Sequence, residues 1–277
     1  MKFTKMHGIG NDYVFVDCFK NDVPDPAAVA RYVSHRHFGI GSDGLILIKP
    51  SDRGDAAMEM YNSDGSRAEM CGNGIRCVAK YVYDHGISVK EDLVIETDAG
   101  LMPLKLNISG DKAESIKVNM GMPMFAPEKI PVKIEALKLV NHEIMVSGRA
   151  FSITCVGMGN PHCVIYVDDV SDFPVHEYGP VIENMDMFPE RTNVEFVEVI
   201  ESGEVRQRTW ERGSGETWAC GTGASAVCAA GVATGRTGKK LLNHLTGGDL
   251  VLEWEQGGPV FMEGPAVEVF SGEITLP

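Results

Sequence analysis

Two cysteines occupy matching frames in this chain, and both could act as acids or bases. Cys71 opens a Cys-Gly-Asn-Gly segment, and Cys220 opens a Cys-Gly-Thr-Gly segment 220 − 71 = 149 residues later. Each segment leads into a stretch with helical spacing, so each thiol is expected at the start of a helix. The dipole and the free N–H groups of such an end bind a carboxylate, and they lower the pKa of a cysteine placed there. The two segments therefore predict a pair of acid–base thiols beside carboxylate-binding amides.

Two such thiols on opposite sides of one ligand suit the inversion of a carbon centre. One thiolate would remove the proton from an amino acid Cα, and the other thiol would return a proton to the opposite face. The intermediate is an enolate of the carboxylate, which the amides of the helix starts would stabilise. This chemistry calls for no cofactor and no metal ion. A dithiol redox pair is an alternative, although such pairs usually have their cysteines close in sequence.

The offset of 149 residues recurs outside the cysteine segments. Gly8-Ile9-Gly10-Asn11 returns as Gly157-Met158-Gly159-Asn160 (157 − 8 = 149), and Asn62 returns as Glu211 (211 − 62 = 149). A constant offset over separate blocks predicts two copies of one structural unit. The stretch after Cys220, residues 224–233, is nearly all small or apolar, so we expect a helix that is buried on every side.

These patterns predict an α/β protein of the α+β type with two structurally similar domains. Each domain is expected to wrap a mixed sheet around a central helix. The proline-containing stretch 120–127 has little periodicity and predicts the junction. The first domain would then comprise residues 1–119 plus 265–277, and the second residues 120–264.

Charge and composition argue against several classes of protein. The net charge is −14, and no basic stripe is present that could bind nucleic acid. No apolar run has the length of a signal peptide or of a membrane span of about 20 residues, so we expect a cytoplasmic protein without membrane contact. The cysteines include no Cys-x-x-Cys pair, which argues against a zinc ribbon and against a secreted disulfide framework.

Several segments of the chain closely resemble the diaminopimelate epimerase family. The resemblance covers nearly the whole chain, and the segments that carry it are His7-Gly8-Ile9-Gly10-Asn11-Asp12, Asn62-Ser63-Asp64-Gly65-Ser66, Cys71-Gly72-Asn73-Gly74-Ile75-Arg76-Cys77, Gly159-Asn160-Pro161-His162, Glu190-Arg191-Thr192-Asn193 and 211–223. It implies a pyridoxal-independent isomerase that interconverts LL- and meso-2,6-diaminopimelate and supplies lysine and peptidoglycan precursors. It also implies two similar domains with the active site in the cleft between them, a small-molecule substrate as partner, and a homodimer.

The resemblance implies a role for individual residues. Cys71 and Cys220 become the acid–base thiols, and His162 and Glu211 become the partners that accept or orient a thiol proton. Glu211 would also pair with the ammonium group of the reacting centre. The residues whose amides would hold the reacting carboxylate are Gly72, Asn73, Gly221 and Thr222. The residues expected to recognise the distal amino acid group are Asn11, Asn62, Asn160, Asn193 and Arg212.

One position departs from the family pattern. Some members carry glutamine where this chain has Gly44, which offers no side chain to a substrate. By the repeat offset, Gly44 is the counterpart of Asn193 (193 − 44 = 149). We therefore expect the two halves to contribute unequally to substrate recognition.

Three other readings remain open. Proline racemases and hydroxyproline epimerases also use two thiols in this fold, but they commonly carry histidine in place of Asn73 and a proline before the second cysteine, where this chain has Ala219. Phenazine-type isomerases share the architecture and lack the thiol pair. From a different class, the chain could be an amino acid binding or redox-sensing protein that uses the same cleft.

Overall fold

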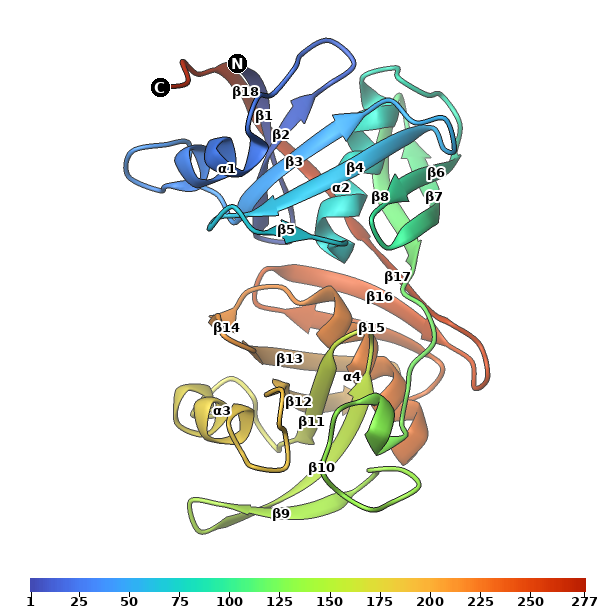
Figure 1. Cartoon of the computed structure of the whole chain (residues 1–277). Helices are drawn as coiled ribbons and strands as arrows, with labels where there is room; N and C mark the ends of the chain where they lie inside the picture. The colour runs from blue at the N-terminus through green and yellow to red at the C-terminus, as the bar shows by residue number, and fades with distance from the viewer. The chain divides into compact units, whose positions relative to one another are not determined.

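The computed structural model describes residues 1–277, which divide into two units (Figure 1). The first unit comprises Met1–Val118 and Glu263–Pro277, and the second comprises Asn119–Met262. Each unit consists of short strands arranged around one long helix, and each contains one cysteine of the matched pair. The fold expected from the sequence, two repeated α+β units with mixed sheets, is confirmed.

The first unit forms its sheet from strands at both ends of the chain. The C-terminal strand β18 (Val267–Glu273) pairs with β1 (Lys2–Gly8), so the red and dark blue ends of the chain run side by side in Figure 1. The pair β2–β3 is parallel, as is β4–β6, and the remaining pairs are antiparallel. The other elements are β2 (Asn11–Asp17), α1 (Pro26–Ser34), β3 (Gly44–Lys49), β4 (Ala56–Asn62), β5 (Arg67–Ala68), α2 (Gly72–Asp84), β6 (Asp92–Thr97), β7 (Gly100–Ser109) and β8 (Lys112–Asn119).

The second unit repeats this order of elements. A parallel pair, β11–β12, is followed by an antiparallel hairpin, β12–β13, and then by the long helix α4. The elements are η1 (Pro127–Lys129), β9 (His142–Val146), β10 (Arg149–Gly157), β11 (Pro161–Tyr166), α3 (Val175–Glu183), β12 (Asn193–Glu201), β13 (Glu204–Glu211), β14 (Gly215–Thr217), α4 (Gly221–Thr234), β15 (Lys240–Leu245), β16 (Gly248–Trp254) and β17 (Val260–Pro265), whose residues from Glu263 on belong to the first unit.

Strand register shows that the two units are copies of one another. In the parallel pair of the first unit, Tyr13 lies opposite Gly44. In the parallel pair of the second unit, His162 lies opposite Asn193, and both residues are 149 positions further along (162 − 13 and 193 − 44). The offset that the sequence shows in its motifs thus holds for the pairing of the strands, which confirms the duplication.

Each unit buries the helix that follows its cysteine. The apolar positions Ile75, Val78 and Val82 of α2 have no exposed surface. In α4, the residues from Gly223 to Gly231 are all buried, as expected for a helix built from small and apolar side chains. At Gly231 a Cβ would lie 2.1 Å from Thr237 Oγ1, so the chain after the helix approaches closer than any side chain would permit. Helices of this chain are too short or too polar to cross a membrane.

Candidate active site

Cys71 is held at the start of α2 by groups from three segments of the first unit. It is the N-cap residue, and its Sγ accepts a hydrogen bond from the backbone N–H of Gly74 at 3.4 Å. The Tyr13 hydroxyl donates to Sγ at 3.8 Å, and Sγ donates to Asn11 Oδ1 at 3.4 Å. Asn73 Nδ2 donates to the same oxygen at 3.3 Å. The structure therefore brings two predicted site residues, Asn11 and Asn73, together beside the thiol of Cys71.

Asn11 is oriented by a charged network that sequence reasoning missed. Its Nδ2 donates to Asp43 Oδ2 at 2.7 Å, and Arg36 Nη2 donates to Asp43 Oδ1 at 2.9 Å. Arg36 also donates a hydrogen bond to Asp12. Burial alone would raise the pKa of Asp12, but hydrogen bonds from Arg36 and Lys5 lower that pKa below its usual value. Burial raises the pKa of Asp43. Asp43 and Arg36 lie outside the repeated blocks, so no sequence signal marked them.

Asn62 and Gly44 lie in one cross-strand row with Tyr13. Gly44 pairs with Tyr13 on one side and with Asn62 on the other. Asn62 Nδ2 donates to Ser66 Oγ at 2.9 Å, within the turn that follows β4. A Cβ at Gly44 would lie 2.1 Å from the carbonyl oxygen of Tyr61, so this backbone leaves no room for a side chain. Position 44 therefore contributes no side chain beside Tyr13 and Asn62, as expected from the sequence.

Cys220 occupies the corresponding place at the start of α4. It is the N-cap residue, its Sγ accepts from the backbone N–H of Gly223 at 3.3 Å, and Thr222 Oγ1 lies 3.5 Å from Sγ. Glu211 ends β13, and its Oε1 accepts a hydrogen bond from the Thr217 hydroxyl. The predicted residues Cys220, Thr222 and Glu211 thus belong to the same part of the second unit.

Both thiols have a pKa above the ordinary cysteine value. Burial raises the pKa of Cys71 and outweighs the lowering by the Gly74 N–H and the Tyr13 hydroxyl, although the side chain keeps some solvent exposure. Burial raises the pKa of Cys220 further, and the negative charges of Glu211 and Glu195 add to the effect. The helix-start donors lower these pKa values as expected, but the expected net lowering is wrong, because desolvation outweighs those donors. Both groups rest as neutral thiols.

His162 lies in a buried hydrogen-bonded chain with Glu195 and Asn160. His162 and Glu195 have no exposed surface, and His162 Nδ1 is 2.7 Å from Glu195 Oε1. His162 Nε2 is 2.8 Å from Oδ1 of the partly exposed Asn160. Sequence reasoning missed Glu195. The sequence does contain one indication of its role, because an acidic residue between Val194 and Phe196 is unusual in a stretch that is predicted to be a buried strand.

Asn193 joins two segments of the second unit through its side-chain amide. Its Nδ2 donates to the carbonyl oxygen of Pro161 at 2.8 Å, and its Oδ1 accepts from the backbone N–H of Arg212 at 2.9 Å. The Arg212 guanidinium donates from Nη1 to the carbonyl oxygen of Glu190 at 3.0 Å. Asn193 is 3% exposed, so it fixes the turn that carries Arg212.

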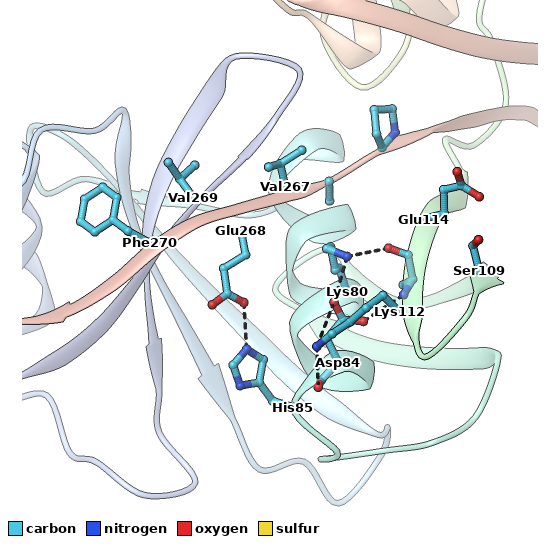
Figure 2. A pocket seen from close by; sticks show the side chains of 13 residues that line it. Lys80, Asp84, His85, Ser109, Lys112, Glu114, Val267, Glu268, Val269 and Phe270 are labelled. Carbon is cyan, nitrogen blue, oxygen red and sulfur yellow. Dashed lines mark hydrogen bonds and ion pairs between the residues drawn. The ribbon is translucent and has the colours of Figure 1, made fainter.

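A groove of about 690 Å³ in the first unit lies apart from the residues predicted from the sequence (Figure 2). It runs between the end of α2 and β18, and none of its lining residues is a predicted site residue. Its charged side chains pair with one another, as Lys80 Nζ does with Asp84 Oδ2 at 2.8 Å and His85 Nε2 with Glu268 Oε2 at 2.9 Å. The groove therefore lacks the free donors that an anionic substrate would need.

Comparison with solved structures identifies the fold. A PhzF-family phenazine biosynthesis protein of Bacillus anthracis superimposes with a TM-score of 0.74 at 16% sequence identity, over 100% of this chain and 99% of that one. A probable proline racemase of Agrobacterium radiobacter superimposes with a TM-score of 0.69 at 16% identity, over 100% of this chain and 93% of that one. At this identity the similarity is one of fold alone.

Comparison of sequences identifies the family. The model of the diaminopimelate epimerase family matches residues 3–126 and 154–269. A diaminopimelate epimerase of Agathobacter rectalis is 52% identical over 100% of both chains, and that of Acetivibrio thermocellus is 52% identical over 100% of this chain and 99% of its own length. The enzyme of Methanococcus maripaludis is 50% identical over 100% of both chains. With this identity along its whole length, the chain belongs to the diaminopimelate epimerase family.

Proposed function

We propose that this chain is a diaminopimelate epimerase, an isomerase that interconverts LL- and meso-2,6-diaminopimelate without a cofactor in the biosynthesis of lysine and peptidoglycan precursors. One observation carries the proposal beyond family membership. Each of the two repeated units places a cysteine at the N-cap of its buried helix, with Sγ accepting from the N–H of the glycine three positions later. Two equivalent thiols are what a two-base inversion needs.

In the proposed reaction Cys71 and Cys220 act on opposite faces of one Cα. One of them, as the thiolate, takes the Cα proton, and the electron pair of the broken C–H bond moves into the carboxylate to give an enolate. The other thiol then gives its proton to the opposite face of the same carbon and is left as the thiolate. Because both thiols rest neutral, forming the first thiolate needs a proton acceptor. We assign that task to Glu211, whereas His162, whose two ring nitrogens contact Glu195 and Asn160, orients the site.

Backbone amides at the two helix starts are proposed to bind the reacting carboxylate. The first N–H groups of a helix have no partner inside the helix, and they stabilise a carboxylate more as its charge grows in the enolate. In this chain the amides belong to Gly72, Asn73, Gly221 and Thr222. Glu211 would pair with the ammonium group on the same carbon.

The distal amino acid group of the substrate is proposed to bind side chains from both units. Arg212 can hold a carboxylate through two parallel hydrogen bonds, which a lysine would not reproduce. The asparagine amides can contact both the carboxylate and the ammonium group, since each amide offers a donor and an acceptor. The asparagines assigned to this task are Asn11, Asn62, Asn160 and Asn193.

Isotope exchange at Cα tests the proposed function. LL-2,6-diaminopimelate incubated with the reduced protein in deuterated water should acquire deuterium at Cα and yield the meso isomer. L-Proline under the same conditions should acquire none. Absence of exchange with both diaminopimelate isomers would exclude the epimerase, and exchange with proline alone would instead support a proline racemase.

We also propose that the protein acts in the cytoplasm and forms a homodimer. Its proposed binding partner is the small-molecule substrate. The homodimer is what the resemblance to the family implies. Light scattering coupled to size-exclusion chromatography measures the mass in solution. A mass near twice that of the 30.1 kDa chain is expected, and a monomer at micromolar concentration would contradict the proposal.

A further inference from the structure

Glu195 is a carboxyl group inside an otherwise apolar part of β12. Its neighbours in the chain, Val194 and Phe196, have no exposed surface, and neither has Glu195 itself. Its cross-strand partners are Val164 and Thr209, which are also buried. A carboxyl group in such surroundings is unfavourable unless a hydrogen-bonded partner compensates for its lost hydration. Its presence at this place therefore needs a reason other than stability.

The Oε1 atom of Glu195 lies between His162 and the start of α4. Oε1 lies 2.7 Å from His162 Nδ1. The same oxygen faces the first turn of α4, where a Cβ added to Gly223 would lie 2.7 Å from it and 3.2 Å from Cys220 Sγ. Oε2 is buried and has no hydrogen-bond partner. A single oxygen atom thus connects Glu195 to His162 beside the helix start of Cys220.

The bond to Glu195 decides which nitrogen of His162 meets Asn160. A carboxylate only accepts hydrogen bonds, so Nδ1 of the ring must carry the proton in this pair. A ring that carries its proton on Nδ1 accepts a hydrogen bond at Nε2, so the Asn160 amide, whose Oδ1 lies 2.8 Å from Nε2, must be turned over to present Nδ2 as the donor. The chain Glu195–His162–Asn160 runs from a side chain without exposed surface to a partly exposed one. Asn160 is held in one position by residues that no solvent reaches.

We propose that Glu195 is a positioning residue of the epimerase, which fixes His162 through Nδ1 and thereby holds the side-chain amide of Asn160 where the substrate binds. The inference rests on the proposed function, since it takes Asn160 as a substrate-binding residue. Glu195 itself touches no substrate. The other copy of the repeat has Ile46 at this position (195 − 46 = 149) and Tyr13 in place of His162 (162 − 13 = 149), so this device belongs to one half of the enzyme.

Two substitutions at Glu195 separate its hydrogen bond from its charge. Glu195→Gln removes the charge and keeps an oxygen that accepts from His162 Nδ1, and no bond is lost at Oε2. Glu195→Met has a similar length and no such acceptor. We expect the KM for LL-diaminopimelate to stay within about twofold of wild type in Glu195→Gln and to rise about tenfold in Glu195→Met. Equal KM increases in the two variants would overturn the proposal, because the charge and not the hydrogen bond would then be responsible.

A double-mutant cycle tests whether the effect passes through Asn160. In an Asn160→Ala background, Glu195→Met should change KM by less than about twofold, since the amide that it positions is gone. Additive effects of the two substitutions would contradict the proposal and indicate a general packing role. Glu198→Met is the matched control: Glu198 lies on the same strand, pairs with Arg206 at 3.0 Å, and should leave KM unchanged.

Nitrogen-15 spectra of the histidine side chains show which ring nitrogen carries the proton, and this measurement does not depend on the Glu195→Met variant. His162 should carry its proton on Nδ1 both in wild type and in Glu195→Gln. A wild-type His162 without a proton on Nδ1 would exclude the proposed bond. Failure of the proposed function would be recognised by a different result: wild-type protein would not exchange the α-proton of diaminopimelate.

Discussion

Ile46 and Glu195 occupy the same place in the two copies of the repeat. Each lies on the strand that pairs in parallel with its neighbour, and each reaches the glycine in the first turn of the central helix. A Cβ on Gly74 would lie 2.8 Å from Ile46 Cδ1, and a Cβ on Gly223 would lie 2.7 Å from Glu195 Oε1. The same backbone arrangement therefore has the methyl group of Ile46 near the helix start of Cys71 and the carboxyl group of Glu195 near that of Cys220.

We predict that alanine at Gly223 is more harmful than alanine at Gly74. At Gly223 the new Cβ would displace Glu195 and would lie 3.2 Å from Cys220 Sγ, whereas at Gly74 it would meet the flexible ends of Ile46 and Met58. Overpacking of this kind lowers the free energy of unfolding by about 1–3 kcal/mol. Because it also moves Glu195 and crowds Cys220 Sγ, Gly223→Ala should lower kcat/KM about tenfold.

The control for this pair is Gly203→Ala. The nearest atom to a Cβ at Gly203 is the Lys240 carbonyl oxygen at 4.0 Å, so this variant should retain wild-type activity. Steady-state rates and thermal unfolding of the three variants decide the matter. Equal activity of Gly223→Ala and Gly74→Ala would show that the Glu195 carboxyl does not constrain the start of α4.

We predict that Cys71→Ala and Cys220→Ala each abolish epimerisation. Each thiol serves one face of Cα, so the loss of either removes the base for one substrate isomer and the acid for the other. Rates are to be measured separately from the LL and meso isomers, with Cys18→Ala as a control, because Cys18 lies in the first unit outside the site. Turnover within about tenfold of wild type by either variant would remove that thiol from the mechanism.

The sequence predicts the backbone of the site better than its electrostatics. The glycines beside Cys71 and Cys220, repeated at a constant offset, mark both helix starts, and the structure has a cysteine N-cap at each. The pKa values of both thiols are raised, whereas the sequence predicts that they are lowered, because each pKa depends on the atoms packed around the thiol. Those atoms come from strands that lie close only after folding, and no local pattern encodes them.

Glu195 and Asp43 were missed for a related reason. Each is an acidic residue whose role depends on a partner more than thirty positions away, His162 for Glu195 (195 − 162 = 33) and Asn11 for Asp43 (43 − 11 = 32). The repeat could not reveal them, since Glu195 corresponds to Ile46 and Asp43 to Thr192 (192 − 43 = 149). A comparison of the two copies of the repeat finds only residues that both copies have in common, and Glu195 and Asp43 each occur in one copy alone.

We predict that Glu211→Gln makes Cys220 react with iodoacetamide at lower pH. Burial is the largest cause of the raised pKa of Cys220, and the negative charge of Glu211 is the next. Removing that charge lowers the pKa of the thiol, which increases the thiolate fraction at a given pH, and the thiolate is the form that is alkylated. Peptide mass spectrometry after brief labelling across a pH series follows Cys220 alone.

Glu198→Gln serves as the control for the alkylation series. Its carboxyl is paired with Arg206 and is not among the groups that shift the pKa of Cys220, so its labelling profile should match that of wild type. A Glu211→Gln profile that is unchanged, or that moves to higher pH, would contradict the assignment of Glu211 as a charge acting on this thiol.

We predict that the protein loses stability above pH 9 and that Cys77 accounts for part of the loss. Burial inside α2 raises the pKa of Cys77 from 9.0 to about 12. The raised pKa means that the folded state holds the thiol proton where the unfolded state has released it. The contribution of Cys77 is fully present below the unfolded pKa and is lost between pH 9 and the folded pKa, by about 1.4 kcal/mol per pH unit.

Urea unfolding at intervals from pH 8 to pH 10.5 measures this loss. Cys77→Ala is expected to be less stable than wild type at pH 8, because it leaves a small cavity in a fully packed helix. Its free energy of unfolding should nevertheless fall less steeply above pH 9, since one thiol that ionises only on unfolding is gone. Other groups with a raised pKa, such as Cys228, contribute equally to both proteins and cancel in the difference. Parallel pH profiles for the two proteins would mean that Cys77 ionises as readily in the folded chain as in the unfolded one.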